Sequence, residues 1–328
     1  MTDTLLYCVT YSTDPYYNLA LEEYLTDTVK TGQCILYLWQ NRHTVVIGRN
    51  QNAWRECRTT KLNEDGGTLA RRLSGGGAVY HDMGNLNFTF SVPEEDYDLA
   101  KQQRVIVEAC RMLGVDAKIS GRNDILANGR KFSGNSFYSH QGKSFHNGTL
   151  LINADMGKMA TYLAPSKLKL EAKGVDSVRA RVVNLCELEP NITVDNMREA
   201  MLKAFCRIYG LEARAICAAC PDKAAIERRR ARFGSYEWVY GRNAEFPLSI
   251  EKRFIWGELA IQLSIKRGIC ADAAVYTDAM DASFALPLRE AIYGSRFDTE
   301  ELCKKVLSVH ECAPYAADIC RMLHEQNI

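Results

Sequence analysis

The 328-residue chain lacks an excess of charge of either sign, long apolar runs and a basic N-terminal segment. Its 41 Lys and Arg residues are balanced by 40 Asp and Glu residues, whereas a nucleic-acid binder usually needs a basic surface to neutralise phosphates. No stretch approaches the ~20 apolar residues of a membrane-spanning helix, and the N-terminal residues do not resemble a signal peptide. We therefore expect a cytoplasmic protein with neither a nucleic-acid nor a membrane partner.

A second closely spaced cysteine pair is also missing. The one Cys-x-x-Cys motif is Cys217–Cys220, and a zinc site built on it would need another pair at a suitable spacing. In a chain without an export signal reduced thiols are the default, and scattered cysteines are typical of small buried apolar side chains. The twelve cysteines therefore favour neither a metal centre nor redox chemistry.

Apolar periodicity predicts strands in hairpins and meanders rather than in regular βαβ alternation. The turn Asn128-Gly129 joins residues 124–127 to residues 130–133, which is typical of a tight β-hairpin. We therefore predict an α+β fold with a mixed or antiparallel sheet, not a doubly wound nucleotide-binding fold. Other strands are expected at residues 4–10, 34–39, 44–47, 85–92 and 148–153, and helices at 15–30, 54–64, 97–113, 155–163, 193–209 and 222–232.

Residues 241–247 have the composition of a linker and predict two domains, residues 1–245 and 246–328. In the second domain we expect strands at 252–265 and 270–278, followed by helices at 286–292, 298–308 and 314–326. In the first, residues 165–183 carry five basic side chains and little periodicity. This pattern predicts a long mobile loop, and loops of that length are uncommon unless they are functional.

The densest chemical signal is the segment Arg71-Arg72-Leu73-Ser74-Gly75-Gly76-Gly77-Ala78-Val79-Tyr80-His81. Consecutive glycines between two strands let backbone N–H groups close on an anionic or bulky ligand, and a guanidinium is the natural partner of phosphate or carboxylate. The segment matches neither the Walker A motif nor the dinucleotide-binding glycine pattern. On residue type alone, a merely flexible loop fits as well as a ligand-binding loop.

Further polar residues surround the Asn-Gly hairpin. Lys131 lies on its return strand, where it could reach a phosphate, although a solvated strand lysine is the plainer interpretation. Asp124 could accept a hydrogen bond from Lys131 or hold a metal, and His146 could bind a ligand, although each alone is more often a turn or satisfied polar residue. The arginine pair, the triglycine, the strand lysine and the basic loop together indicate a phosphate-rich ligand, and ATP used for adenylation fits them.

At these residues the chain resembles the bacterial lipoate–protein ligase A family. The resemblance covers most of residues 5–190, and its most specific parts are the triglycine segment and Arg130-Lys-Phe-Ser-Gly134. Residues beyond about 248 match only weakly by motif, but their place and size resemble the family's accessory domain. The other matching segments, in family order, are residues 14–23, Thr44-Val-Val-Ile-Gly-Arg49 with Gln51-Asn52, Gly121-Arg-Asn-Asp124, Gly148-Thr-Leu-Leu151 and residues 177–185.

The resemblance implies a fold like that of biotin ligases and class II aminoacyl-tRNA synthetases, and a two-step reaction. Lipoate, or octanoate, reacts with Mg²⁺-ATP to give an acyl-adenylate. The acyl group then passes to a lysine of an acceptor domain, in the E2 subunit of a 2-oxo-acid dehydrogenase or in the glycine-cleavage H protein. The basic loop matches the family's adenylate-binding loop.

Carried over residue by residue, the resemblance also implies roles for the site. Lys131 should be the catalytic residue and contact both the lipoyl carboxyl oxygen and the α-phosphate. The residues expected to bind the nucleotide are Arg72, Gly77, Ala78, Val79, Tyr80, Asp124 and Lys131. Lipoate should be contacted by Trp39 at its dithiolane end and by Ser74, Gly75, Gly76, His81 and His146.

One position departs from the family. Many relatives have two consecutive His residues before Gly-Thr-Leu, whereas this chain has His146-Asn147, and asparagine does not titrate near neutral pH. Two alternatives stay open on the sequence: an ATP-independent octanoyl or lipoyl transferase of the same superfamily, and a non-catalytic lipoate- or nucleotide-binding protein. The accessory region argues against the first, and Lys131 with the triglycine argues against the second.

Overall fold

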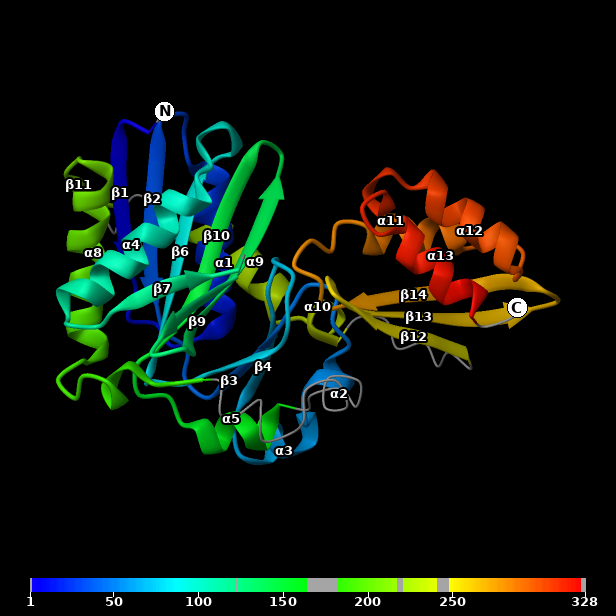
Figure 1. Ribbon diagram of the computed structural model, residues 1–328, viewed down its shortest axis with the longest axis horizontal. Coiled ribbons are helices and arrows are strands. Elements are labelled where there is room, and N and C mark those ends of the chain that lie inside the picture. Colours follow the sequence, from blue (N-terminus) through cyan, green and yellow to red (C-terminus); the bar gives the residue numbers. More distant parts are fainter. Residues whose placement is uncertain (1, 122, 164–181, 217–220, 241–247, 326–328) are drawn as a thin grey trace.

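The computed structural model describes residues 2–121, 123–163, 182–216, 221–240 and 248–325. Two bodies lie side by side, a large one that contains the N-terminus and a smaller one that contains the C-terminus (Figure 1). We call the smaller body, residues 248–325, the C-terminal unit. No helix in these ranges is long and apolar enough to cross a bilayer.

The large body is built on an eight-stranded mixed sheet with the order β11-β1-β2-β6-β10-β9-β8-β7. The strands β11, β1 and β2 are parallel, and the remaining neighbours are antiparallel. This arrangement confirms the predicted α+β class with a mixed sheet. The strand bounds are β1 (Thr4–Val9), β2 (Gln33–Trp39), β6 (Asn85–Pro93), β7 (Ala117–Ser120), β8 (Asp124–Ala127), β9 (Arg130–His140), β10 (Lys143–Leu151) and β11 (Ala213–Ala215).

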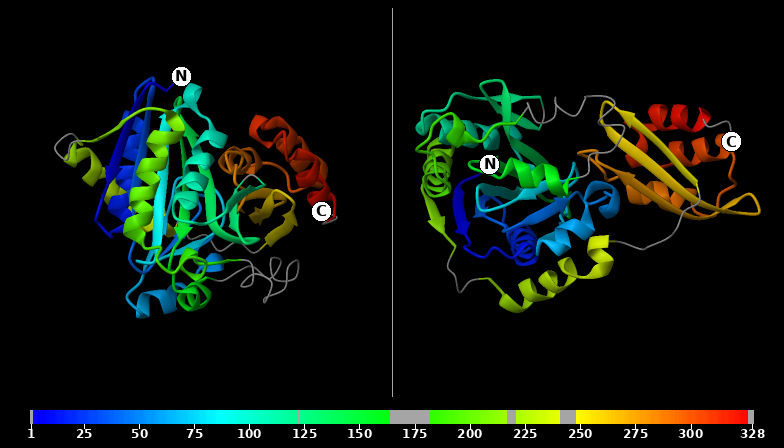
Figure 2. Two further views of the ribbon diagram at one scale, coloured as in Figure 1. Left: turned by 60° about the vertical axis from the view of Figure 1, so that its left-hand side comes forward. Right: turned by 90° about the horizontal axis from the view of Figure 1, so that it is seen from below.

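Helices cover both faces of this sheet, as Figure 2 shows. Along β2, Cys34, Leu36 and Leu38 face α4 (Leu99–Met112) and α8 (Val194–Tyr209) in one core, whereas Tyr37 and Trp39 belong to a second core with α1 (Pro15–Thr28) and α9 (Lys223–Phe233). This double burial explains why β2 is a continuous apolar run. Helix α1 begins as its sequence predicts, because the Asp14 carboxylate accepts from the backbone N–H groups of Tyr16 and Tyr17.

A second, three-stranded sheet holds the triglycine segment beside the large sheet. Its order is β4-β3-β5, with β3 (Thr44–Ile47), β4 (Thr68–Arg71) and β5 (Val79–His81). The loop between β4 and β5 therefore starts and ends on strands that flank β3. Short helices surround this sheet: α2 (Ala53–Glu56), α3 (Thr59–Glu64), α5 (Met156–Tyr162) and α10 (Tyr236–Tyr240).

The C-terminal unit packs three helices on one face of a three-stranded antiparallel sheet and has its own apolar core. The predicted single strand over residues 252–265 is wrong, because the chain reverses at Ile255-Trp256 between two strands. The two turn residues are large and apolar, and the single Gly257 that follows them lacks the Asn-Gly pair of the earlier hairpin. The apolar pattern of the sequence therefore continues through the turn. The elements are β12 (Leu248–Phe254), β13 (Gly257–Lys266), β14 (Ile269–Thr277), α11 (Ala285–Ile292), α12 (Thr299–Ser308) and α13 (Ala316–His324).

Other predictions differ in detail or cannot be compared. The helix expected over 54–64 is interrupted at Cys57, which bridges to Leu163, and β7 and β11 were not predicted. Most of the basic loop, residues 164–181, lies outside the described residues, as do Cys217–Cys220 and the linker 241–247 at the expected domain boundary. Three short 3-10 helices complete the described chain: Glu94–Asp96, Leu185–Glu187 and His310–Cys312.

Candidate active site

A cavity of about 250 Å³ lies between the large sheet and the triglycine segment. Nine of the thirteen residues that the sequence proposed for the site line it, and they come from both sheets. Ser74, Gly75, Tyr80 and His146 do not line it. The nine are Trp39, Arg72, Gly76, Gly77, Ala78, Val79, His81, Asp124 and Lys131.

Strand register explains how distant segments share one wall of the cavity. Residues that pair across neighbouring strands project to the same face of a sheet. Five cavity-lining residues pair in one row from β2 to β8: Trp39, Asn87, Thr149, Gly134 and Asp124. At about 4.8 Å per strand, the row spans about 14 Å from Trp39 to Gly134, enough for an extended eight-carbon acid.

The open end of the row carries an ion pair. The ammonium of Lys131 lies 2.7 Å from the Asp124 carboxylate, and the two side chains are 37% and 43% exposed. A Cβ atom on Gly134 would lie 3.1 Å from Nζ of Lys131, so glycine here leaves room for the lysine side chain. A half-exposed ammonium group at this end of the cavity can exchange the Asp124 carboxylate for a ligand oxygen.

The opposite end is closed and buried. Trp39 and His81 meet edge to face with ring centroids 6.1 Å apart, and each side chain is 3% exposed. Burial and the nearby Arg72 guanidinium lower the pKa of His81 to about 3, so its ring is neutral at physiological pH. Leu19 completes an apolar, aromatic wall.

A hydrogen-bonded floor lies beneath this wall. Oε1 of the buried Glu22 accepts from Thr89 Oγ1 at 2.6 Å and from Asn147 Nδ2 at 2.9 Å. Asn147 Oδ1 in turn accepts from Ser136 Oγ at 2.5 Å, and Thr89 Oγ1 accepts from Trp39 Nε1 at 3.3 Å. Desolvation raises the pKa of Glu22 to about 7, against the hydrogen bonds from Thr89 and Asn147, which lower it. Sequence reasoning missed Glu22, because a glutamate inside an amphipathic helix is normally solvent-exposed.

The two arginines before the triglycine differ in what they bind. Arg71 does not line the cavity: its guanidinium donates to backbone carbonyls of Gly48, Arg49, Gln51, Trp238 and Val239. Arg72 lines the cavity and shapes the loop by donating to the Gly75 carbonyl at 2.6 Å and the Gly77 carbonyl at 2.8 Å. Its Nε has no partner among the described residues. Burial lowers the pKa of both to about 10, so both remain cationic at neutral pH.

The four predicted residues that do not line the cavity are held behind it. The His146 ring lies in the core between Gln102 and Asn135, and its burial lowers its pKa to about 3. Tyr80 packs against Tyr162, in a different apolar cluster. Ser74 Oγ lies 2.9 Å from Ser136 Oγ and so supports a residue that does line the cavity. Sequence spacing places these residues near the site but does not fix the direction of their side chains.

The C-terminal unit touches the triglycine directly. The Gly76 N–H donates to the Ala279 carbonyl at 3.1 Å, and a Cβ atom on Gly75 would lie 2.5 Å from the Met280 carbonyl. Met280 itself lines the cavity, the one described lining residue beyond position 149. The packing of this unit therefore requires glycine at positions 75 and 76. No sequence motif pointed to Met280.

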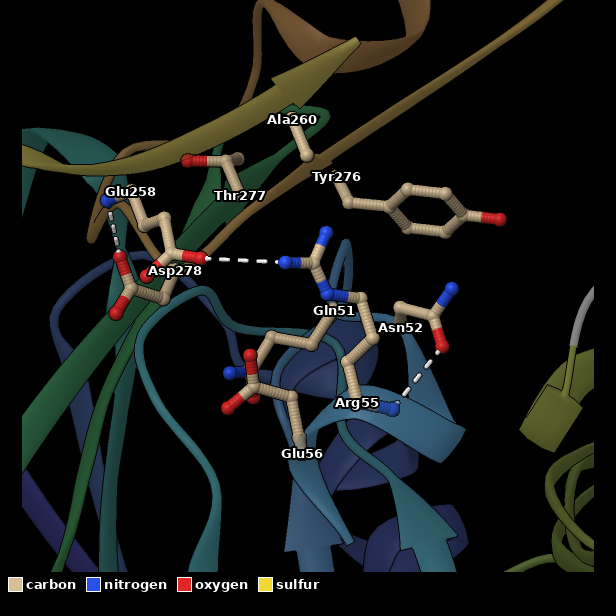
Figure 3. A pocket seen from close by; sticks show the side chains of 9 residues that line it. All are labelled: Gln51, Asn52, Arg55, Glu56, Glu258, Ala260, Tyr276, Thr277 and Asp278. Carbon is tan, nitrogen blue, oxygen red and sulfur yellow. Dashed lines mark hydrogen bonds and ion pairs between the residues drawn. The ribbon is translucent and has the colours of Figure 1, made fainter. Parts of the chain in front are cut away.

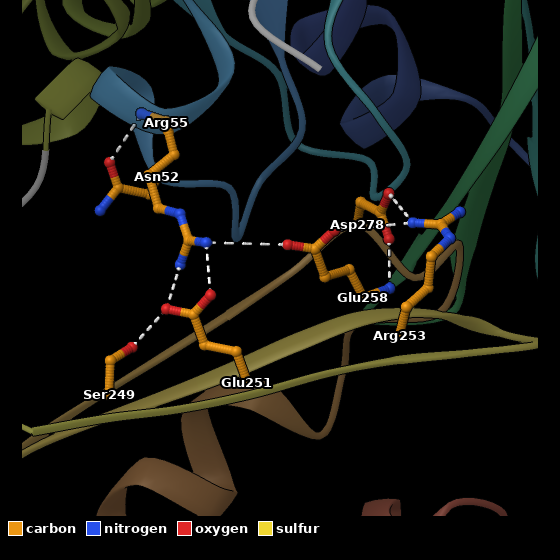
Figure 4. Close-up of polar contacts among 7 residues, drawn as sticks. All are labelled: Asn52, Arg55, Ser249, Glu251, Arg253, Glu258 and Asp278. Carbon is orange, nitrogen blue, oxygen red and sulfur yellow. Dashed lines mark hydrogen bonds and ion pairs between the residues drawn. The ribbon is translucent and has the colours of Figure 1, made fainter. Parts of the chain in front are cut away.

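Ion pairs hold the two bodies together next to this contact (Figures 3 and 4). Arg55 of α2 reaches Glu251 of β12 at 2.8 Å through Nη1 and at 2.5 Å through Nη2, and lies 3.9 Å from Glu258 of β13. The Thr277 N–H donates to the Asn50 carbonyl at 2.8 Å, and Asn50 Nδ2 donates to the Ala282 carbonyl at 2.9 Å. These bonds bracket the loop that carries Met280.

The arrangement is suited to a linear acid. The apolar closed end can accommodate the hydrocarbon chain of an acid, and the hydrogen-bonded polar groups lie beside that chain. The Lys131 ammonium lies where the carboxylate of such an acid would be. A second cationic group, the Arg72 guanidinium, and Lys131 both line a space bordered by backbone from Gly76 to Val79. Such a site can stabilise negative charge that develops on a carboxylate and on a phosphate.

The chain is similar to known proteins over nearly its whole length. A family model described as the lipoyl protein ligase A/B catalytic domain matches residues 14–206, and one described as the bacterial lipoate protein ligase C-terminus matches residues 243–319. A lipoate-protein ligase A of Psychrobacter cryohalolentis is 38% identical over 313 residues, which are 93% of this chain and 92% of that relative.

Two solved structures are similar in fold. LipL1 of P. falciparum in complex with lipoate has a TM-score of 0.85 and 28% identity, covering 97% of this chain and 98% of that one. A lipoate-protein ligase A bound with ATP has a TM-score of 0.62 and 26% identity, covering 74% of this chain and 99% of that one. The likeness therefore extends through both bodies in the first structure.

Proposed function

Because the chain belongs to the lipoyl protein ligase A/B family and also carries the C-terminal region of bacterial lipoate protein ligases, we propose how its cavity performs that chemistry. The protein is an ATP-dependent lipoate–protein ligase. Its reaction forms lipoyl-AMP from lipoate and ATP, and then an amide with a lysine of an acceptor protein. The observation that carries the assignment of roles is the row from the buried Trp39 end to the half-exposed Lys131.

Lipoate lies along this row with its dithiolane ring at the Trp39 end and its carboxylate at Lys131. A carboxylate oxygen attacks the α-phosphorus of ATP, the bond to the bridging oxygen breaks, and pyrophosphate leaves with the electron pair. Lys131 exchanges Asp124 for the carboxyl oxygen and the α-phosphate, where its fixed charge stabilises the negative charge of the transition state. The nucleotide lies along Gly77, Ala78 and Val79, beside Arg72.

In the second step the ε-amine of the acceptor lysine attacks the lipoyl carbonyl carbon. The bond to the AMP oxygen breaks, AMP leaves, and the amine loses its proton. The exposure of the Lys131 end allows an incoming lysine to reach the activated carbonyl, whereas the Trp39 end is closed. The acceptors we propose are the lipoyl domains of E2 subunits and the glycine-cleavage H protein.

Mg²⁺ accompanies ATP in this reaction. Asp124 is the one carboxylate among the described residues that line the cavity, and no group of three or more His, Cys, Asp or Glu side chains in the described chain is arranged to hold a metal. Mg²⁺ keeps much of its coordination on phosphate and water, so a single carboxylate fits an ion that arrives with the nucleotide. Asp124 would hold it, and the ion would neutralise the leaving pyrophosphate.

Four of the residues expected in the site lie outside the cavity lining, and the two domains also need roles. We propose that Ser74, Gly75, Tyr80 and His146 act on the ligands through their neighbours, and that residues 1–245 form the catalytic domain and 246–328 the accessory domain. The requirement for ATP favours a cytoplasmic reaction.

An ATP-independent transferase that uses a cysteine nucleophile fits less well, because no cysteine is among the described residues that line the cavity.

The test is a reconstituted reaction. The purified protein, lipoate, Mg²⁺-ATP and an apo lipoyl domain are incubated together, and pyrophosphate release and acceptor mass are measured. We expect stoichiometric pyrophosphate and a lipoylated acceptor. Transfer from an acyl carrier without pyrophosphate would instead support the transferase, and adenylation without transfer would limit the protein to the first step.

A further inference from the structure

At the closed end of the cavity, two buried polar groups have no partner among the described residues. One is Nε2 of His81 and the other is Nδ2 of Asn87, and both residues line the cavity. They are 3% and 1% exposed. A buried N–H without a partner is costly, by about 1–3 kcal/mol, so a group that supplies an acceptor there is favoured.

A chain of hydrogen bonds fixes His81 as a donor at Nε2. Asn18 Nδ2 donates to the carbonyls of Ser12 and Gln40, at 2.9 and 2.8 Å, which sets the orientation of its amide because carbonyls only accept. The same amide nitrogen lies 3.0 Å from Asn41 Oδ1, with which it shares one of its two hydrogens, since a second NH2 group at that distance would be repelled. Asn41 therefore presents its Nδ2 to His81 Nδ1 at 3.2 Å. His81 Nδ1 must therefore accept, and the proton of the neutral ring is on Nε2.

Asn87 stands beside Trp39 in the row that crosses the sheet. Its Oδ1 accepts from Asn85 Nδ2 at 2.9 Å, which leaves Nδ2 as the group without a partner. Asn87 pairs with Trp39 in the strand register, and Trp39 meets His81 edge to face. The indole, the imidazole and the amide therefore surround one place, the end of the cavity that the tail of a bound acid would reach.

The two N–H groups without partners, on His81 and Asn87, favour one kind of tail on the bound acid. We propose that His81 and Asn87 select an acid whose distal ring carries hydrogen-bond acceptors, namely the two sulfur atoms of a 1,2-dithiolane, over an acid whose tail is only hydrocarbon. The proposal rests on the proposed function, because it places the carboxylate at Lys131 and hence the tail at Trp39.

The physical reason is an asymmetry between the two kinds of tail. A thioether or disulfide sulfur is a weak acceptor, but it still gives a buried donor a partner. A hydrocarbon tail that fills the same space removes water from both N–H groups and offers them no hydrogen-bond acceptor. A site built around a buried donor therefore rejects the analogue that lacks the acceptor more strongly than an apolar pocket rejects a change of shape.

The test compares lipoate with 5-cyclopentylpentanoic acid, which has the same chain and a five-membered ring of carbon alone. Binding of each acid to the full-length protein is measured by titration calorimetry without ATP, and kcat/KM is measured by pyrophosphate release. We expect the wild-type protein to bind lipoate at least about tenfold more tightly than the carbocycle. Equal affinity for the two acids overturns the proposal.

Variants separate recognition from a structural role. Asn87→Leu and His81→Phe should each lower the ratio of the two affinities about threefold to tenfold by weakening lipoate alone. His81→Gln, which keeps an N–H donor, should retain a higher ratio than His81→Phe. Thr149→Val, in the same row but nearer Lys131, should leave the ratio unchanged even if both acids bind less well.

Two controls keep the outcome interpretable. The double variant Asn85→Leu/Asn87→Leu removes both members of the amide pair and so leaves neither without a partner, which covers the case that Asn87→Leu misfolds. If the folded variants weaken both acids equally, His81 and Asn87 only support the wall and the inference fails. If the wild-type protein binds lipoate selectively but releases no pyrophosphate, the proposed function fails while the selectivity stands.

Discussion

The two ends of the cavity hold their polar groups in opposite ways. At the closed end, Trp39, His81 and the Glu22 carboxylate are buried and tied into chains of hydrogen bonds that reach back to α1. At the open end, Lys131 is half exposed and pairs with Asp124. Recognition of the acyl chain of the substrate therefore uses rigid groups, whereas chemistry at the carboxylate uses a group that can change partners.

Replacing the lysine at the open end should stop the reaction without harming the fold. Lys131→Ala is expected to lower kcat/KM for adenylation by about 10³-fold or more, because a fixed charge beside the α-phosphate is lost. The melting temperature should stay within about 2 °C, since the side chain is partly exposed. Arg130→Ala is the matched control, because its side chain pairs with Glu187 on the surface.

A Lys131→Ala variant with wild-type rates would remove Lys131 from the mechanism. A variant that loses activity and also has a much lower melting temperature would show that Lys131 belongs to the rigid framework of the site. The two ends of the cavity would then not differ in the way described.

The buried carboxylate of the floor should make stability depend on pH. The folded pKa of Glu22, about 7, lies above the value of about 4.3 in an unfolded chain, so its contribution is fully present below about pH 4.3 and lost as pH rises through 7. Between pH 5 and pH 8 the wild type should lose up to about 3 kcal/mol more free energy of unfolding than Glu22→Gln. Urea unfolding at several pH values measures this difference.

His81 and His146 are shifted in the opposite sense, but both are present in the two proteins, so their contributions cancel in the comparison. Parallel pH curves for the wild type and Glu22→Gln would show that Glu22 is not buried as a carboxylic acid.

The contact from the C-terminal unit should matter for substrate binding more than for stability. Met280→Ala removes a thioether from the cavity wall, and we expect the KM for lipoate to rise about tenfold with kcat little changed, because a uniform binding contact is lost. Met280→Leu should restore most of the affinity. Ser283→Ala, an exposed position in the same loop, is the control.

An unchanged KM for both lipoate and ATP in Met280→Ala would show that Met280 only fills space beside Gly76. It would also assign the whole recognition surface to the large body.

The smallest effect is expected for the ion pair between the two bodies. Arg55 and Glu251 are about one third exposed, so a double-mutant cycle with Arg55→Ala and Glu251→Gln should give a coupling of about 0.5–1 kcal/mol in the free energy of unfolding. The coupling should shrink at high salt. No measurable coupling at low salt would mean that this ion pair does not help to dock the C-terminal unit.

Much of the fold was readable in the sequence, for local reasons. The apolar run of β2, the Asp14 cap of α1 and the Asn128-Gly129 turn each depend on residues a few positions apart. The reversal at Ile255-Trp256 was missed because both residues are apolar and the glycine after them is not part of an Asn-Gly pair. The site residues were found by motif resemblance, and nine of thirteen line the cavity.

The class of fold, the family and the segments that meet at the site all follow from the sequence. The roles of adjacent residues within those segments depend on how the chain packs in three dimensions. Arg71 and Arg72 are adjacent and chemically identical, but carbonyls more than 160 positions away occupy the first, and the second faces the cavity. Glu22, Asn87 and Met280 entered the site because strand register and domain packing brought them there. A buried polar group can bind a ligand only where no protein group already satisfies its hydrogen bonds, and packing between distant segments determines which groups are satisfied.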